Sequence, residues 1–402
     1  MADNLFGLSS ISDIANIYDR LYEWCNLRDF SGADPFDGLN SKYFQRSPLK
    51  RFALARLAFL QLVKRSHRDL RSTFKVSEDV NSKALALFAL AEMSRFRATG
   101  DERHAQNGRQ LLDRLSTLEI DLRDAGLAWG YNFDWQSRAF FAPKGTPTIV
   151  PTAFAAKAFA EGAELFGDHT YAEKVIGVST FIRETLNRSF ETDTELCFSY
   201  TPLDTSLIFN ASLLAAESLA LAHRLTGDGD LKILVEKSLR YVINRQKADG
   251  GWDYGTRWRH RWMDNFHTAY ILLSIHRLKN YGLNVNLPIE KCLVHGIDFW
   301  IDNFFLDDGT PKYFPESVHP VDIHSAAAAI GAAMELSTFD KRGEKIGRNV
   351  LRWTIRNMMD EEGFFYYQIS KKGKIKTPFM RWGQAWMAHA LAAYLECDKG
   401  GA

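Results

Sequence analysis

Residues 250–278 read GGWDYGTRWRHRWMDNFHTAYILLSIHRL. The stretch opens as an aromatic loop with glycines, passes through polar residues that suit a helix start, and ends as an apolar helix. The same order recurs in residues 126–165, 196–225, 309–336 and 362–395. The loops are roughly fifty to seventy residues apart, which leaves room for two helices per unit.

A second, more charged helix is expected in each interval. Residues 171–186, 231–246, 290–305 and 345–359 carry apolar residues at i, i+3, i+4 and i+7 with charges between them, which is typical of an amphipathic helix. The helices after the aromatic loops are rich in alanine and poor in charge, so we expect them to be buried on most sides. The amphipathic helices would then form an outer layer.

Two concentric helix layers predict an all-α protein with an (α/α)6-type toroid of helical hairpins and short strands only in loops such as 364–370 and 374–380. We expect one domain over residues 1–402, with N-terminal hairpins in about 10–120 and the repeats in about 121–398. The N-terminal helices are expected near 11–27, 48–64, 81–97 and 103–118. An open α-solenoid is the alternative, but its repeats usually have short and similar loops.

Composition excludes several function classes. Lys and Arg number 50 against 49 Asp and Glu, so no long-range field favours nucleic acid as a partner. The four cysteines are scattered and form no CxxC pair, and no glycine-rich phosphate loop or GxSxG elbow is present, so no cofactor is expected. The sequence shows no leader peptide and no apolar run of spanning length, which predicts a cytoplasmic protein with no transmembrane segment.

Repeated Asp and His residues at two helix starts are the candidate catalytic groups. Asp264 and His267 are three residues apart, and Asp322 and His324 hold the matching place in the next unit. If the repeats are radial, both pairs face the central cavity and can act as general acid and base. Helix capping accounts for one of Asp264 and Asn265, and a metal site is the other alternative, although no tight His motif exists.

The same loops carry the aromatic and polar groups that a sugar site needs, namely flat apolar faces and fixed hydrogen-bonding groups. The candidate substrate-binding residues are Trp129, Tyr131, Asn132, Gln136, Arg138, Trp252, Tyr254, Asn265, Lys312, Tyr313, Arg381, Trp382 and Gln384. The cations among them suggest a site for a uronate, sulfate or phosphate group. Any single ring or charge can instead be packing or solvated surface. Residues 29–44, with Asp34, Asp37 and Asn40, predict a structured loop over the cavity.

Two resemblances follow from these motifs. YVINRQKADGGW, with Gln246, Gly251 and Trp252, resembles the QxxDGGW-type repeat of α/α toroids, although the acidic signatures of terpene cyclases are missing. DPFDGLNS, WGYNFDWQSRAFF, DNFHTAY, PVDIHSAAAAI and PFMRWGQAW together resemble the VpsJ-type family of bacterial polysaccharide-biosynthesis proteins. That resemblance implies an α/α toroid that takes part in making exopolysaccharide or lipopolysaccharide, and it carries no reaction and no catalytic residues.

The sequence therefore favours a carbohydrate-active enzyme of surface polysaccharide biosynthesis that performs hydrolysis, elimination or epimerisation. In this hypothesis Asp264 and Asp322 are the acid/base pair and the two histidines assist. Arg138 and Arg381 hold an anionic group, and Trp129, Trp252 and Trp382 stack on sugar rings. The partner would be a saccharide or glycan precursor, together with polysaccharide assembly enzymes. The alternatives are a non-catalytic glycan-binding or scaffold protein and a cyclase, which would need an apolar cavity.

Overall fold

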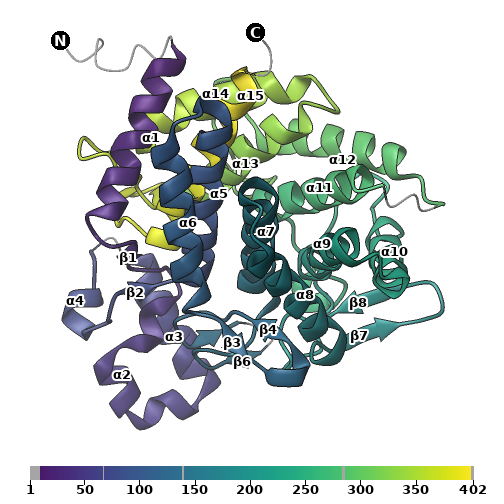
Figure 1. The fold of residues 1–402 in the computed structure, drawn as a ribbon. Coiled ribbons are helices and arrows are strands. Elements are labelled where there is room, and N and C mark those ends of the chain that lie inside the picture. Colours follow the sequence, from purple (N-terminus) through teal and green to yellow (C-terminus); the bar gives the residue numbers. More distant parts are fainter. Residues whose placement is uncertain (1–9, 67, 138–139, 283–285, 400–402) are drawn as a thin grey trace.

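A computed structural model describes residues 10–66, 68–137, 140–282 and 286–399 of the chain. Six helices form an inner ring in which each helix packs on the next and the last packs on the first. They are α5 (Ser82–Thr99), α7 (Ile149–Phe166), α9 (Phe209–Thr226), α11 (Asn265–Asn280), α13 (Ile323–Leu336) and α15 (Ala385–Lys399). The predicted all-α toroid is confirmed (Figure 1).

Six further helices cover the ring from outside. They are α6 (Glu102–Ser116), α8 (His169–Glu184), α10 (Gly229–Ile243), α12 (Ile289–Phe304), α14 (Arg342–Met358) and α1 (Ile11–Asn26). Five of these helices follow the inner helix that they cover. The exception is α1, which packs on α15, so the sixth hairpin is made from the two ends of the chain (Figure 1).

The sequence explains the two layers. Every residue from Ser82 to Arg95 in α5 is buried, as the run of alanine and leucine predicts. In α14 the buried side chains include Val350, Leu351, Thr354 and Ile355, which share one face, while charged residues between them face the solvent. The inner helices therefore need neighbours on all sides, and the outer helices need only the ring.

The helix predicted near 48–64 exists as α3 (Ala53–Arg65), but it does not belong to the ring. It packs mainly on the 3-10 segments η1 (Asp37–Asn40) and η2 (Pro48–Arg51). Only two of its side chains, Leu60 and Val63, are buried, which is too few for a ring helix. The short helices α2 (Lys42–Arg46) and α4 (Arg71–Phe74) lie in the same N-terminal insertion, residues 27–81, at the bottom of Figure 1.

Strands occur only as short antiparallel groups in the described loops. The pairs are β1 (Ser31–Gly32) with β2 (Asp79–Val80), β3 (Ile120–Asp121) with β4 (Leu127–Ala128), β5 (Trp135–Gln136) with β6 (Phe141–Ala142), and β7 (Arg188–Glu191) with β8 (Leu196–Phe198). The strands β9 (Val321–Asp322), β10 (Gln368–Ser370) and β11 (Gly373–Ile375) form one sheet. This sheet ties the loop before α13 to the loop before α15, and short strands do occur in the two loop segments where they were expected, 364–370 and 374–380.

Ionisable residues from all six inner helices form ion pairs away from the N-terminal ends of these helices. Arg277 of α11 binds Glu335 of α13 at 2.6 Å and Glu217 of α9 at 3.3 Å. Arg97 of α5 binds Glu396 of α15 at 2.6 Å, and it also binds Glu161 of α7 at 3.3 Å. We call this set the ion-pair ring. It links α11 to its neighbours α9 and α13, and α5 to its neighbours α7 and α15.

Replacing Arg277 by Met should lower the free energy of unfolding by about 3 kcal/mol, because the buried carboxylate of Glu217 and the partly exposed carboxylate of Glu335 lose their shared partner. Urea titration measures this change. Arg342→Met is the matched control, since its ion pairs with Asp298 and Asp340 are half-exposed and should contribute little. Equal effects of the two substitutions would contradict a structural role for the ion-pair ring.

Candidate functional site

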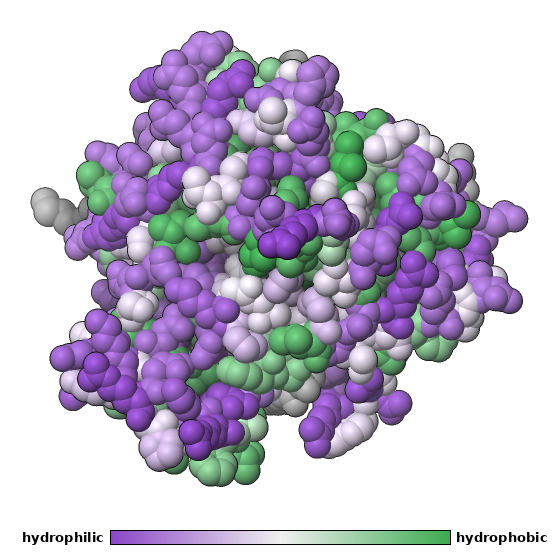
Figure 2. Space-filling model, turned by 60° about the horizontal axis from the view of Figure 1, so that its bottom comes forward, coloured by the Kyte–Doolittle hydropathy of each residue, from purple (hydrophilic) through white to green (hydrophobic). Residues whose placement is uncertain are grey.

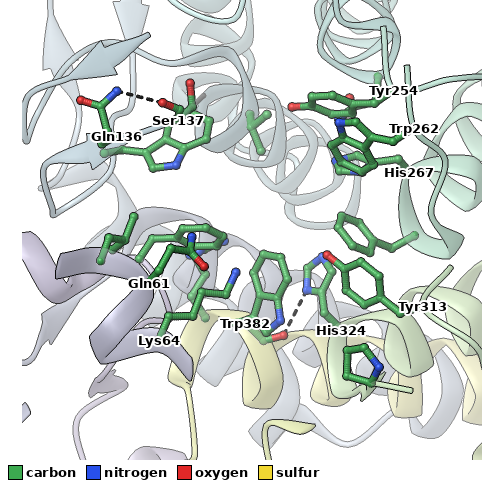
Figure 3. A pocket seen from close by; sticks show the side chains of 18 of the residues that line it. Gln61, Lys64, Gln136, Ser137, Tyr254, Trp262, His267, Tyr313, His324 and Trp382 are labelled. Carbon is green, nitrogen blue, oxygen red and sulfur yellow. Dashed lines mark hydrogen bonds between the residues drawn. The ribbon is translucent and has the colours of Figure 1, made fainter. Parts of the chain in front are cut away.

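The N-terminal ends of the inner helices meet at one pocket of about 1010 Å³. Lys83, Asn210, His267 and His324 stand in the first turns of α5, α9, α11 and α13, and all four line its wall. The loops before α7, α9, α11, α13 and α15 contribute most of the rest, as the radial arrangement of the repeats predicts. Helix α3 of the N-terminal insertion forms one side of the pocket with Leu57, Gln61 and Lys64 (Figure 3).

His267 is held in one orientation by Asp264. The Oδ1 atom of Asp264 accepts a hydrogen bond from the backbone N–H of His267 at 2.8 Å and so caps α11. The Oδ2 atom lies 2.7 Å from Nδ1 of the imidazole. Because a carboxylate only accepts, the proton of the neutral ring sits on Nδ1, and Nε2 keeps its lone pair on the pocket side.

His324 is fixed by three neighbours. Its Nδ1 donates to the backbone carbonyl of Trp382 at 3.0 Å, drawn in Figure 3, so its Nε2 accepts from the hydroxyl of Tyr270 at 2.7 Å. The indole of Trp382 stacks on the imidazole with 4.0 Å between ring centroids. Burial, with the charge of Lys83 as a smaller cause, holds the pKa of His324 well below its usual value. The ring is therefore neutral and faces the pocket together with Tyr270.

The two predicted catalytic carboxylates lie behind these imidazoles and not on the wall. Asp264 is 1% exposed and Asp322 is fully buried. The Oδ1 atom of Asp322 accepts from the backbone N–H of His324 at 2.8 Å and from Nε1 of Trp382 at 3.0 Å, and its Oδ2 accepts from Gln368 at 2.5 Å. Both of its oxygens already accept hydrogen bonds within the protein, so this placement favours an orienting role for the carboxylates over the expected direct acid/base role.

Four of the predicted aromatic residues lie on the pocket wall: Tyr131, Tyr254, Tyr313 and Trp382. The Tyr254 ring stacks on Trp262 at 4.5 Å and packs against His267 at 4.4 Å. Figure 3 shows Tyr254, Trp262 and His267 as one group, across the pocket from Trp382 and Lys64. The pocket therefore offers flat apolar faces beside hydrogen-bonding groups, which suits a sugar ring.

Trp129 and Trp252 do not reach the pocket. Both indoles are buried in the core, where Nε1 of Trp129 donates to the carbonyl of Leu115 and Nε1 of Trp252 donates to that of Val242. Their predicted stacking role does not fit, because no face is open to a ligand. The DGGW segment has a structural function instead, and Gly251 allows close contact with Phe299.

Four polar residues predicted to bind substrate connect loops inside the protein. Asn265 bonds to Trp300 and to the carbonyl of Lys312, and Gln384 bonds to both backbone groups of Phe365. The other two also lie off the wall: Asn132 accepts from Asn81, and Lys312 donates to the carbonyl of Pro315. Arg138 lies outside the described residues.

Arg381 and Gln136 line the pocket but already have partners. The guanidinium of Arg381 binds both carboxylate oxygens of Asp34, at 2.6 and 2.8 Å. This pair joins the predicted loop over the cavity to the π-helical turn η5 (Met380–Gln384) before α15. Gln136 accepts from Arg56 at 2.7 Å. The charge of Arg381 is thus largely balanced, which weakens its expected role as an anion binder.

The electrostatics of the pocket nevertheless favour an anion. Its described wall includes the cations Lys64, Arg65, Lys83, Arg259, Lys371 and Arg381 and no aspartate or glutamate. Burial lowers the pKa of Lys64 to about 8 and that of Lys83 well below its usual value. The N-terminal ends of the inner helices add partial positive charge at the same place. Both the cationic side chains and the helix ends would stabilise an anionic group bound here.

Sequence reasoning missed several residues of the wall, of which Tyr270 and Lys83 are the most informative. Tyr270 stands three residues after His267, so helical spacing places the two on neighbouring faces. Lys83 is a lone charge at the start of an apolar helix, the same place that His267 and His324 hold in their units. Its ammonium lies 4.4 Å from the Phe154 ring and 4.9 Å from the Trp386 ring.

Within the described ranges, no three His, Cys, Asp or Glu side chains gather as a metal ion would need. In the same part of the chain, no helix has the length and apolar character required to cross a bilayer.

No family model and no curated protein matches this sequence. Solved structures do match in fold. Cellobiose 2-epimerase from Bacillus thermoamylovorans has a TM-score of 0.62 at 14% identity, over 80% of this chain and 90% of that chain. A GH76 α-mannanase from Bacteroides thetaiotaomicron has 0.60 at 10% identity, over 79% and 86%. An unsaturated glucuronyl hydrolase specific for heparin has 0.57 at 13% identity, over 79% and 86%. These likenesses show the toroid fold.

Asp322→Asn tests the buried carboxyl through pH. Burial raises the pKa of Asp322 to about 6. The folded state then binds this proton more tightly than the unfolded state. The stabilisation that comes from the protonated carboxyl is therefore complete below about pH 4 and is lost as the pH rises through about 6. Between these pH values the wild type should lose about 3 kcal/mol of unfolding free energy relative to the variant.

Urea titrations at a series of pH values measure this difference. Asp302→Asn on α12 is the control, because its exposed carboxylate should give a curve parallel to that of the wild type. A parallel curve for Asp322→Asn as well would show that the carboxyl does not titrate in this range.

Proposed function

We propose that this protein is an enzyme that moves a proton at a carbon next to a carbonyl group of an anionic saccharide, as an epimerase or isomerase does. The observation that carries the proposal is that two imidazoles of the described wall, those of His267 and His324, are held in fixed orientations, while the wall has no carboxylate. Their fixed orientation suits proton transfer, since a base must be aimed at the hydrogen that it removes.

Of the three reactions predicted from the sequence, namely hydrolysis, elimination and epimerisation, hydrolysis has the least support. Glycosidases generally use two carboxyl groups on either side of the scissile bond, about 5–9.5 Å apart. The carboxylates of Asp264 and Asp322 are buried behind His267 and His324 and are committed to hydrogen bonds. The two residue pairs can instead supply an oriented base and an oriented acid.

In the proposed reaction, Nε2 of His267 takes the proton from the carbon beside the carbonyl of the open-chain sugar. The C–H electron pair passes into an enediolate, whose negative charge the cations of the wall stabilise. Return of a proton to the other face, from the Tyr270 hydroxyl, inverts the carbon. The proton held by His267 then passes to the Tyr270 oxygen through the bound hydroxyl groups, which restores both residues, and Nε2 of His324 keeps that hydroxyl in place. Asp264 is a positioning residue that also stabilises the imidazolium.

The biological setting belongs to the same proposal. The resemblance to the VpsJ-type family supports a step in surface polysaccharide biosynthesis, beside other assembly enzymes. Among the neighbours in fold, the cellobiose 2-epimerase supports the reaction class and the glucuronyl hydrolase supports an anionic substrate. We place the reaction in the cytoplasm, since the buried cysteines Cys25, Cys197 and Cys292 form no disulfide. The cationic wall argues against the cyclase alternative.

Deuterium exchange in D₂O distinguishes proton transfer from hydrolysis and from binding alone. We expect NMR to show deuterium at one sugar carbon when the enzyme meets its substrate, tested on uronic acid disaccharides, sugar phosphates and neutral disaccharides. His267→Asn and His324→Asn should each slow the exchange at least ~100-fold.

His295→Asn is the matched control, because this exposed histidine of α12 lies in the outer layer. Unchanged exchange in both pocket variants would remove the assigned roles. Calorimetric binding of a saccharide without any exchange or conversion would instead favour a non-catalytic glycan-binding protein.

A further inference from the structure

The N-terminal insertion carries a strong local charge in an almost neutral protein. Residues 42–75 contain ten Lys and Arg against one acidic residue, Asp69, although the whole chain has a net charge of +1. Seven of these cations are exposed: Lys42, Arg46, Lys50, Arg51, Arg65, Arg68 and Lys75. Charges of one sign repel one another, so this cluster is unfavourable unless it meets a partner of opposite charge.

Large apolar side chains are exposed among these cations. Leu54 of α3 is 81% exposed, Phe52 is 62% exposed and Leu62 is 53% exposed. Leu54, Ala58 and Leu62 share one face of α3, and this face points away from the buried Leu60 and Val63. Tyr43 and Leu49 are half-exposed nearby. We call these exposed apolar residues and the seven cations the basic apolar surface.

A second element with the same character lies at the pocket mouth. The side chain of Trp258, in the 3-10 turn η4 (Trp258–His260), is 74% exposed and is flanked by the exposed Arg257, Arg259 and Arg261. Arg259 lines the pocket, as do Gln61 and Lys64 of α3, so both elements border the same opening. Figure 2 brings the bottom of Figure 1 forward and shows apolar residues among hydrophilic ones there.

We infer that this face docks on a bilayer that contains anionic phospholipids, with the pocket mouth toward the headgroups. Basic side chains are attracted electrostatically to the phosphate groups of anionic lipids. Exposed Trp, Phe and Leu side chains insert at the boundary between headgroups and acyl chains. A protein partner fits less well, because interface cores are usually depleted in charge and here cations surround every apolar group. The inference goes beyond the proposed reaction, since it concerns where the enzyme works.

Sedimentation with vesicles tests the docking. We expect the wild-type protein to sediment with vesicles of phosphatidylcholine containing about 30% phosphatidylglycerol and to stay in solution with pure phosphatidylcholine. Raising the salt to about 0.5 M should release it, because the attraction is screened. Phe52→Ser with Leu54→Ser, and separately Lys50→Glu with Arg51→Glu, should each weaken the partition at least ~10-fold.

Matched variants on the opposite part of the molecule control for general changes in hydrophobicity and charge. Leu225→Ser with Ile233→Ser removes residues that are 46% and 56% exposed, and Lys291→Glu with Arg352→Glu reverses two exposed charges of α12 and α14. Both should bind vesicles as the wild type does. Circular dichroism confirms that every variant is folded.

Failure to sediment with the anionic vesicles overturns the inference, and it would leave a protein as the partner of this face. Equal binding to both vesicle types, or equal losses in the control variants, also overturns it. The measurement uses no substrate, so its failure would leave the proposed reaction untouched, and failure of the deuterium exchange would leave the docking untouched.

Discussion

The common direction of the six inner helices is the constraint on which the site depends. Each inner helix is followed by an outer helix that returns the chain, except α15, which is covered by α1. All N-terminal ends therefore lie at one end of the toroid. Free backbone amides, capping side chains and helix dipoles gather there without any long-range sequence signal. Residues far apart in the chain, such as Lys83 of α5 and Trp386 of α15, become neighbours for this reason.

Asp264 and Asp322 show how a structural device is used for chemistry. A cap needs one acceptor oxygen, and a carboxylate has two. In Asp264 the second oxygen orients the imidazole of His267, and in Asp322 it binds Gln368 of the loop before α15. The caps and the histidines thus form units at two adjacent helix starts. The backbone that defines the helix also fixes the direction of the side chain that faces the ligand.

The sequence was sufficient to predict the fold because alanine-rich and amphipathic helices differ in burial. The spacing of apolar residues along each helix shows which faces are buried. The sequence was sufficient for the place of the site, since loops at equivalent positions must meet. It was not sufficient to separate Trp382, which lines the pocket, from Trp252, which is buried. Both follow glycine-containing or aromatic loops, and the difference comes from packing, since the Trp252 ring lies directly against Gly296 of α12. The α3 helix was predicted but misplaced, because its two buried residues allow a rim position.

The ion-pair ring has a consequence for the kind of molecule that the toroid can accept. Arg277 with Glu217 and Glu335, and Arg97 with Glu161 and Glu396, link neighbouring inner helices at the end opposite the pocket. These residues lie away from the N-terminal ends that line the pocket, and the side chains of Glu217 and Arg277 are mostly buried. In the proposed function, a substrate would therefore enter and leave at the pocket mouth, which favours short saccharides or chain ends over the interior of a long glycan.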